Sequence, residues 1–571
     1  MKKTIRIFNV LFILLCSTPP LCHAFEVETH KVINEYIAQG TINGFSLNDY
    51  LKNNLGFQKG VEETFTLGES KMVFAWLGKG GKKEDVPEIL RNKNHFHDPL
   101  SNKGFGGLMG GLIFSGESSI IWSQKPIATQ SPGGYYSWFD TRDYFHKALT
   151  STTKDERGRY YAETFRGIGQ LMHLVHDASV PSHTRNEFHA GYHYEGFVSY
   201  YQNQDKVAGN NYEGKFSSLL ASPVSFDQSL LNISSPLASI PFANIFDSEK
   251  YTVTNPDPLV TLGNNIGLAE YTNANFFGDM TIFQKYPHPA KENTNAVLRE
   301  KEAEDGVLDK VYYIQGYQSD SLSAYSYFAN LDISGSPEGW KYNLDDDVYE
   351  DYATLLLPRA VGYSAGLLNY FFRGKIDIII DPNNSSRYII KNLSNENMFG
   401  AFSLYYDDTN NNRYLVASWG NLAINANSQS SSVTFTSPSS PAPKEKGKYI
   451  LVFQGTFGNE IGAVMGKVVE GLCAGQWGLI DYCWGNTGDC YNHIAYRDII
   501  DGFIYEVAWC IKGISSSCDF CNRYYCGACA SPPANPTTCI WGCLGECENE
   551  GARNFDKCCA TGWSKYAWQC I

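Results

Sequence analysis

The feature that most constrains this chain is a cluster of metal-binding side-chain types in residues 172–195, MHLVHDASVPSHTRNEFHAGYHYE. This segment holds five of the chain's 12 histidines, together with one aspartate and two glutamates. His173 and Asp177 are four residues apart at the end of a stretch with helical periodicity, so their side chains share one helix face. Pro181 is expected to end that helix. The loop that follows is then placed to fold back over the same face.

Histidines are more often ordinary residues, each satisfied by a local hydrogen bond. That interpretation suits a single histidine better than five within one short segment. A carboxylate buried among several imidazoles is costly unless a cation offsets the cost, and imidazole and carboxylate are ligands that suit zinc. The cluster therefore predicts a metal site, to which His183, His189 and Glu195 contribute from the loop.

The first 24 residues are typical of a secretory signal. Basic residues at the start precede an apolar run from Ile7 to Cys16, and Ala24 stands at a suitable cleavage point. We expect a secreted or periplasmic protein whose mature chain begins with a free α-amino group at Phe25. No later stretch offers the 18 or more consecutive apolar residues that a membrane span requires.

The chain that follows this signal is too long for a single hydrophobic core. Apolar residues recur with helical period up to about Arg373, interrupted between about residues 202 and 346 by a polar, aromatic stretch that we interpret as long loops with a few helices. Short alternating runs from Gly374 predict a small antiparallel β-sandwich. We therefore expect four parts: a signal peptide (1–24), an all-α helical catalytic domain (25–373), a β-sandwich accessory domain (374–470) and a small disulfide-rich module (471–571).

Cysteines occur only near the two ends of the chain. Two lie within the signal, and the other fourteen of the 16 fall between Cys473 and Cys570. An even number of cysteines in an exported chain predicts a disulfide framework whose pairing the sequence does not reveal. Zinc binding is the weaker alternative, because four of these cysteines have ligand-like spacing: Cys518, Cys521, Cys526 and Cys529.

Two segments nearer the N-terminus carry further candidate ligands. The first, FEVETH, contains Phe25 and His30. The second, KKEDVPEILRNKNHFHDP, contains Glu84, Asp85, His95, His97 and Asp98.

Four pieces of the chain, in this order, resemble the zinc-dependent phospholipase C superfamily, which also contains the single-strand-specific zinc nucleases. They are Phe25…His30, Asp85…HFHDP at His95, HLVHDASVPSH from His173 to His183, and His189…YEGFV at Glu195. The resemblance spans residues 25 to about 200, and it does not cover the two C-terminal modules.

The resemblance implies an all-α fold whose three zinc ions bind a phosphodiester. The implied ligands of the first zinc are Asp85, His95, His173 and Asp177. Those of the second are His183, His189 and Glu195. The third would take the amino nitrogen and carbonyl oxygen of Phe25 together with His30, while Asp177 bridges. Asp85 is also the candidate general base, and Glu84 remains an alternative to it as a ligand.

The chain departs from the family pattern at two further positions. The first residue of the mature chain is Phe25 rather than tryptophan, a change that a backbone ligand tolerates. The histidine that pairs with Glu195 lies four residues earlier in the family, where this chain has Gly191. His189 and His193 both compete for that role, and we prefer His189 because a residue two before Glu195 on a helix would point away.

The other histidines are expected to be structural. His176 should face away from His173 as an ordinary surface residue, and His97 and Asp98 are expected beside the metal ligands as supporting residues. His146 lies on an amphipathic helix, where a histidine is more often structural than ligating.

The sequence therefore predicts a secreted zinc-dependent phosphodiester hydrolase, in the first place a phospholipase C that cleaves phospholipid to diacylglycerol and a phosphorylated head group. The motif HFHDP resembles the phospholipase form more closely than the nuclease form, and the β-sandwich offers a surface for docking on a membrane. The alternatives are an extracellular nuclease on the same zinc cluster, because substrate choice lies in loops, and a non-catalytic surface-binding protein. A net charge of −14 argues against a basic nucleic-acid scaffold, and no stable protein partner is implied.

Overall fold

A computed structural model describes residues 27–107, 114–188, 193–254, 261–284, 286–302, 308–325, 341–408, 410–435, 448–469, 478–483, 490–500 and 503–510. The predicted ligands Phe25 and His189 lie outside these ranges, as does most of the cysteine-rich tail.

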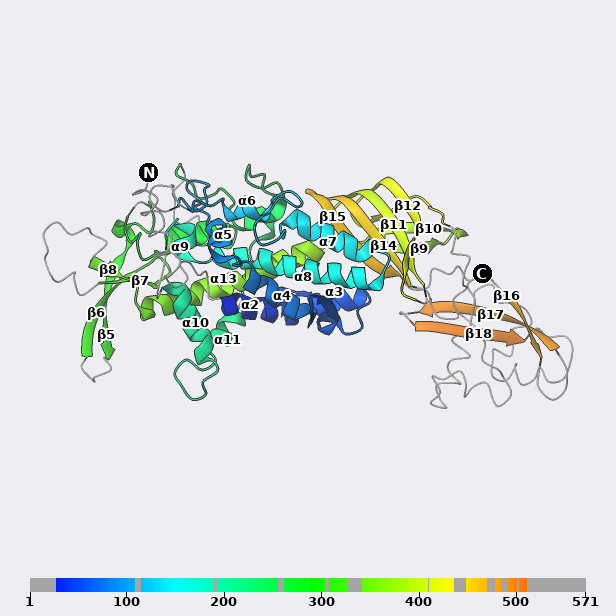
Figure 1. The fold of residues 1–571 in the computed structure, drawn as a ribbon, viewed down its shortest axis with the longest axis horizontal. Coiled ribbons are helices and arrows are strands. Elements are labelled where there is room, and N and C mark those ends of the chain that lie inside the picture. Colours follow the sequence, from blue (N-terminus) through cyan, green and yellow to red (C-terminus); the bar gives the residue numbers. More distant parts are fainter. Residues whose placement is uncertain are drawn as a thin grey trace, which may run out of the picture.

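The chain up to Phe372 is built mainly from helices, among which α8 and α13 run through the centre with α2 and α4 beside them (Figure 1). The helices are α2 (Val27–Gln39), α3 (Leu47–Asn53), α4 (Val73–Lys83), α5 (Glu88–Arg91), α6 (Ser119–Ser123), α7 (Trp138–Thr150), α8 (Lys154–Asp177), α9 (Pro181–Thr184), α10 (Tyr194–Gln204), α11 (Lys215–Leu220), α12 (Leu268–Asn275) and α13 (Asp346–Phe372).

Helix α8, which carries two candidate ligands, has sequence signals at both ends. Thr153 precedes it, and the side chains and backbone amides of Thr153 and Glu156 exchange hydrogen bonds in a capping box. At the other end α8 stops at Asp177, and Pro181 occupies the first turn of α9, where a missing N–H costs nothing. The chain therefore turns immediately after Asp177, as the sequence predicts.

Glycines let α4 and α8 approach each other closely. A Cβ atom at Gly80 would lie 2.2 Å from a backbone oxygen of α8, and a Cβ atom at Gly169 would lie 2.1 Å from a backbone oxygen of α4. No side chain fits in such a space, so the two helices touch backbone to backbone. This contact brings the carbonyl oxygen of Gly81 within 2.7 Å of the imidazole of His173.

The part that the sequence predicts to be all-α also contains strands. Two small hairpins pair β1 (Thr41–Ile42) with β2 (Phe45–Ser46) and β3 (Thr64–Leu67) with β4 (Glu69–Met72). A four-stranded antiparallel sheet has the order β5 (Asn295–Glu302), β6 (Leu308–Gln315), β7 (Ser321–Tyr325) and β8 (Tyr342–Asn343). The prediction of long loops was wrong for this sheet, because its apolar residues are interrupted by charged ones and the pairing of distant segments decides the strand conformation.

Two antiparallel sheets follow the helices and share one hydrophobic core. One has the order β13-β10-β9 and the other β12-β11-β14-β15. The strands are β9 (Ile376–Asp381), β10 (Asn384–Asn392), β11 (Met398–Asp407), β12 (Arg413–Ile424), β13 (Ser428–Gln429), β14 (Lys448–Phe457) and β15 (Glu460–Val469). Buried side chains of both sheets, among them Ile378, Ile390, Phe402 and Phe453, pack against one another. A helical part followed by a β-part is what the sequence predicts.

Three more strands lie in the segment for which the sequence predicts a disulfide-rich module. They are β16 (Gly478–Cys483), β17 (Cys490–Ile500) and β18 (Phe503–Cys510), paired antiparallel in that order. The predicted disulfides concern side chains outside the described residues, and they stay a prediction.

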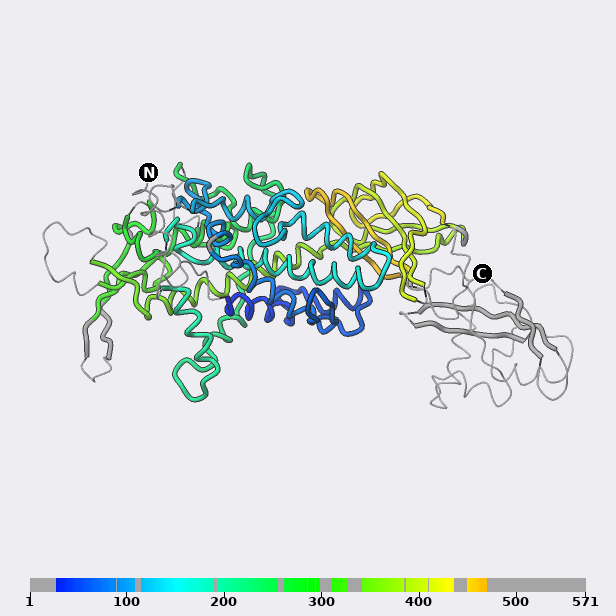
Figure 2. The backbone as a smooth tube through the Cα atoms, viewed as in Figure 1, coloured from blue at the N-terminus to red at the C-terminus, as the bar shows by residue number. Residues whose placement is uncertain are grey.

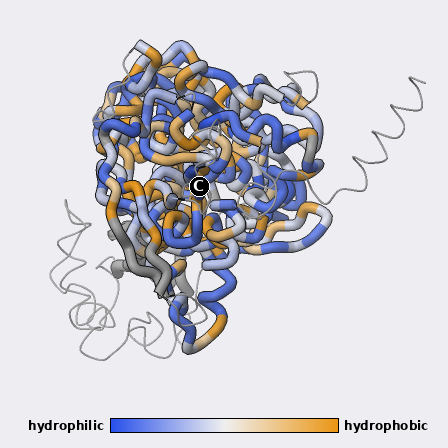
Figure 3. The backbone as a smooth tube through the Cα atoms, turned by 90° about the vertical axis from the view of Figure 1, so that its left-hand side faces the viewer, coloured by the Kyte–Doolittle hydropathy of each residue, from blue (hydrophilic) through white to orange (hydrophobic). Residues whose placement is uncertain are grey.

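Hydrophobic and hydrophilic residues are interleaved along the backbone, as expected where each element buries one face (Figure 3). Within the described ranges, no helix combines the length and the apolar character that crossing a bilayer requires.

A buried carboxylate joins the helices to the sandwich. It lies where the backbone of β15 runs beside that of α7 (Figure 2). Glu460, at the start of β15, is 0% exposed. Its carboxylate accepts hydrogen bonds from Arg142 Nε at 2.8 Å, Trp138 Nε1 at 3.0 Å and Arg373 Nη1 at 2.5 Å. Burial would raise the pKa of Glu460, but the two guanidinium groups outweigh burial and lower it. The two parts are therefore held by a desolvated ion-pair network rather than by a loose linker.

Replacing Glu460 by glutamine should destabilise the protein strongly, because two buried guanidinium groups would lose their counter-charge. We expect the free energy of unfolding to fall by about 3–5 kcal/mol, measured by urea denaturation at pH 7. Glu396→Gln is the matched control, because Glu396 pairs with the same Arg373 but its side chain is 32% exposed; its expected cost is below about 1 kcal/mol. Equal unfolding midpoints for the two variants would contradict the role of Glu460.

Candidate metal centre

Seven of the nine predicted ligands lie in the described part of the chain, and all seven are buried, with at most 2% of each residue exposed. They come from α2, from the loops after α4 and α5, from the end of α8, and from α9 and α10. The seven are His30, Asp85, His95, His173, Asp177, His183 and Glu195.

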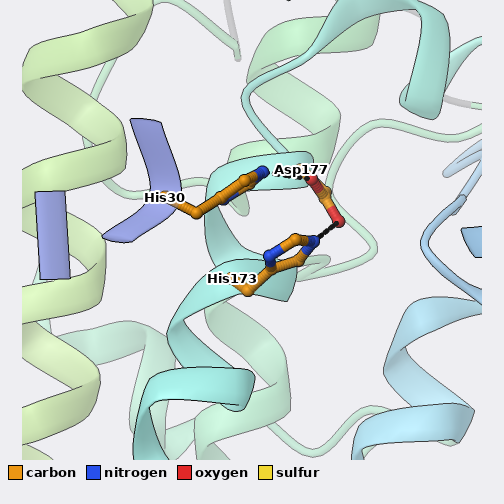
Figure 4. A group of neighbouring side chains, drawn as sticks. All are labelled: His30, His173 and Asp177. Atoms are coloured by element: carbon orange, nitrogen blue, oxygen red, sulfur yellow. Dashed lines mark ion pairs between the residues drawn. The ribbon is translucent and has the colours of Figure 1, made fainter. Parts of the chain in front are cut away.

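The carboxylate of Asp177 lies between imidazoles that come from different elements (Figure 4). Its Oδ1 is 3.6 Å from Nε2 of His30, and its Oδ2 is 3.2 Å from Nε2 of His173 and 3.0 Å from Nδ1 of His95. The ring of His30 stacks on that of His173, with centroids 3.6 Å apart. One carboxylate thus faces three ring nitrogens, which is an arrangement suited to a bridging ligand.

A second group of donor atoms shares His173 with the first. Oδ1 of Asp85 is 3.6 Å from Nδ1 of His95 and 3.7 Å from Nε2 of His173. The donor atoms of this trio lie within 4.8 Å of one another, as do those of His30, His173 and Asp177. Such spacing fits an ion with ligand bonds of about 2.0–2.2 Å in either group. Because Nε2 of His173 has one lone pair, His173 can bind the ion of only one group at a time.

Asp85 supplies an independent test of whether a cation fits here. The residue is 1% exposed, yet neither of its carboxylate oxygens accepts a hydrogen bond from any residue that the structure describes. A buried carboxylate without a donor is costly, and burial raises the pKa of Asp85. A bound cation would remove that cost, so the donor set fits a metal such as zinc.

The imidazole of His173 is oriented by the backbone of α4. Its Nδ1 lies 2.7 Å from the carbonyl oxygen of Gly81, so Nδ1–H donates to that oxygen and Nε2 faces the two carboxylates. Burial opposes a charge on this ring, but Asp177 and Asp85 outweigh burial and raise the pKa of His173 to about 10. A proton and a metal ion therefore compete for Nε2.

Glu84 and Asp85 are neighbours in the sequence but face different surroundings. The carboxylate of Glu84 accepts hydrogen bonds from Arg91 Nη2 at 2.5 and 2.6 Å and from Trp122 Nε1 at 2.9 Å. Its Oε1 also lies 3.8 Å from Nε2 of His95, behind the ring. This geometry favours Asp85 over Glu84 as a ligand, because Arg91 and Trp122 already donate to the carboxylate of Glu84.

A third group lies at the start of α10. Oε1 of Glu195 is 3.2 Å from Nε2 of His183, and Oε2 is 2.6 Å from Nδ1 of His193. The expectation that His193 points away was wrong, because α10 begins at Tyr194 and His193 precedes it with an extended backbone. His189 lies outside the described residues, so the choice between the two histidines stays open.

His176 also differs from expectation. It is 0% exposed rather than at the surface, and its Nδ1 lies 3.1 Å from Nδ1 of His30. Residues three apart on a helix share a face, so His176 belongs to the same side of α8 as His173. Its burial results from α2 packing against α8, which the local sequence does not reveal.

His97 and Asp98 support the loop rather than the side chains of the ligands. The imidazole of His97 bonds to Ser118 Oγ at 2.9 Å and Asp247 Oδ2 at 2.7 Å, while its backbone N–H donates to the carbonyl oxygen of His183. The carboxylate of Asp98 accepts hydrogen bonds from the backbone N–H of Leu100 and the hydroxyl of Ser101.

No family model and no curated protein matches the chain. Among solved structures, it overlaps the alpha toxin from Clostridium absonum at 11% identity, with 78% of this chain and 95% of the toxin covered and a TM-score of 0.27. It also overlaps Clostridium perfringens alpha-toxin from avian strain SWCP at 12% identity, with 86% and 97% covered and a TM-score of 0.23. Both TM-scores are too low to establish a common fold, so the function has to be inferred from the side chains of the site.

Zinc binding to the metal-free protein should release protons. Because its pKa is about 10 instead of 6.5, His173 is protonated at pH 7 and must lose that proton to bind a metal through Nε2. His30 contributes none, because burial and the charge of His173 lower its pKa well below 6.5. We expect about one proton to be released from His173 at pH 7, and the zinc affinity to fall as the pH is lowered.

The measurement is calorimetric titration with zinc in two buffers of different ionisation enthalpy. The variant His173→Gln is the control, because it lacks this proton while every other zinc-binding group of the chain is unchanged. Equal binding enthalpies in both buffers for the unchanged protein would contradict the prediction.

Proposed function

We propose that the protein is a zinc-dependent phosphodiester hydrolase. The observation that carries this proposal is the convergence of buried imidazole and carboxylate donors from six separate helices and loops of the chain. The donors are nitrogen and oxygen atoms, which suit zinc. Bound zinc would supply positive charge that stabilises phosphate oxygens and lowers the pKa of water towards neutrality.

The residues of the chain take different parts in this proposal. Asp177 faces His30 of the first donor group and His95 of the second, so it couples the two groups. The carbonyl oxygen of Gly81 orients His173. Asp85 is the proposed general base, because its carboxylate lies at the centre beside His95 and His173.

We propose phospholipid as the substrate, cleaved to diacylglycerol and a phosphorylated head group. Three features support phospholipid over nucleic acid. The motif HFHDP resembles the phospholipase form, and the sandwich beside the helices offers a surface for docking on a membrane. In addition, the net charge of −14 opposes the binding of a long polyanion such as single-stranded DNA.

The protein with zinc should release phosphocholine from phosphatidylcholine vesicles, and a chelator should abolish this activity. His173→Ala should lower the rate at least about 100-fold, because loss of an essential ligand removes more than loss of an outer partner, which itself costs about 10–100-fold. His146→Ala is the matched control, because His146 is a half-buried histidine of α7 and should leave the rate near that of the unchanged protein.

Single-stranded DNA is assayed in parallel to separate the candidate functions. Chelator-sensitive release of nucleotides alone would keep the metal centre and replace the substrate. Hydrolysis that a chelator does not affect would overturn the role of zinc. If the His173→Ala variant has the same biological effect as the unchanged protein, the alternative of a non-catalytic surface-binding protein is favoured.

We propose further that the chain is exported and that cleavage of the signal creates a ligand at Phe25. His30 is in the first turn of α2, which begins at Val27, so the new terminus is only a few residues from a candidate ligand. Extra residues left before Phe25 should then cost one zinc ion and most of the activity, measured by metal analysis and the phospholipid assay. The same extra residues added at the C-terminus are the control. Full metal content in the protein with extra residues before Phe25 would rule out Phe25 as a ligand.

A further inference from the structure

One buried histidine of the centre has no place in the proposed ligand set. His176 lies on α8 between His173 and Asp177 and is 0% exposed. Its ring is nearly parallel to that of His30, at an angle of 18°, with centroids 5.3 Å apart. Its Nδ1 lies 3.1 Å from Nδ1 of His30, and its Nε2 has no hydrogen-bond partner among the described residues. A buried polar side chain with one such contact needs an explanation.

The tautomer of His30 decides which of the two rings donates this hydrogen bond. Nε2 of His30 is the atom that faces Asp177, at 3.6 Å, so Nε2 is the nitrogen that would bind a metal and its lone pair must be available. A neutral imidazole then carries its proton on Nδ1. That Nδ1–H group points at Nδ1 of His176, which acts as the acceptor.

We propose that His176 is a positioning residue that accepts the hydrogen bond from His30 and so directs Nε2 of His30 towards Asp177. His173 shows such an arrangement at this centre, because its Nδ1–H donates to the carbonyl oxygen of Gly81 at 2.7 Å while its Nε2 faces the carboxylates. Metal-binding histidines generally need such a partner on the second ring nitrogen. His176 fills this place for His30, with its Nδ1 3.1 Å from Nδ1 of His30.

A side chain is needed here because of how His30 meets α8. The ring of His30 stacks on that of His173 and therefore lies over the side of the helix. Backbone carbonyl groups in a helix point along its axis and bond within it, so an acceptor from the side of α8 must come from a side chain. His176 stands at the helical spacing from His173 that places it on this side.

The test uses the full chain and measures zinc affinity by competition with a chromophoric chelator, without any substrate. His176→Phe keeps a planar ring and removes the acceptor, and we expect it to weaken the binding of one zinc ion about 10–100-fold. His176→Asn is the matched control, because its Oδ1 can take the place of Nδ1, and its affinity should stay close to that of the unchanged protein.

A double-mutant cycle separates positioning from simple packing. In a His30→Ala background, His176→Phe should cause no further loss of zinc affinity, because the residue acts through His30. The proposal is overturned if His176→Phe binds zinc as tightly as the unchanged protein, if the Asn variant loses as much as the Phe variant, or if the loss persists without His30. Should the Phe variant fail to fold, His176→Leu takes its place.

This inference rests on the proposed function only for the presence of zinc. A chain that binds zinc but hydrolyses neither phospholipid nor DNA would contradict the proposed function and leave this test intact. If the His30→Ala variant binds zinc as tightly as the unchanged protein, the positioning role of His176 is overturned.

Discussion

The structure around α8 depends on one buried negative charge, the carboxylate of Asp177. Burial alone would raise the pKa of Asp177, but the imidazoles of His173, His95 and His183 outweigh burial and hold its pKa well below 3.8. The charge therefore persists on a side chain that is 0% exposed, and it must be balanced. A proton on His173 can balance it, and so can a metal ion, and the two compete. The glycines of α4 and the break at Pro181 matter because they bring the balancing groups to this carboxylate.

Local spacing made part of this centre predictable from the sequence. His173 and Asp177 are four residues apart, and α8 does end at Asp177, before a proline that begins the next helix. Helical geometry alone then places the two side chains on one face. The different surroundings of Glu84 and Asp85 were not predictable, because they depend on how the chain folds Arg91 and Trp122 back onto Glu84. The sheet β5-β6-β7-β8 was missed for a similar reason, since pairing between segments outweighs their weak local pattern.

The two misjudged histidines show how errors at helix boundaries and in burial arise. His193 lies one residue before α10, and the boundaries of a helix are the part that a sequence predicts least well. Because α10 begins one residue after His193, His193 has an extended backbone and its side chain contacts Glu195 instead of pointing away from it. His176 shares a helix face with His173, and only the packing of α2 on α8 buries it beside His30. Both errors concern contacts that a neighbouring element creates.

The metal centre and the sandwich are linked through the same helices. Arg142 of α7 and Arg373, which directly follows α13, both bind the carboxylate of Glu460 on β15. Helix α7 packs along α8, and α8 carries His173 and Asp177. Movement of the sandwich relative to the centre would have to separate desolvated ion pairs, which is costly. A sandwich that docks on lipid would therefore hold the metal centre at a fixed distance from the membrane surface. That distance, rather than a flexible tether, would then decide how far a phospholipid must extend from the membrane to enter the site.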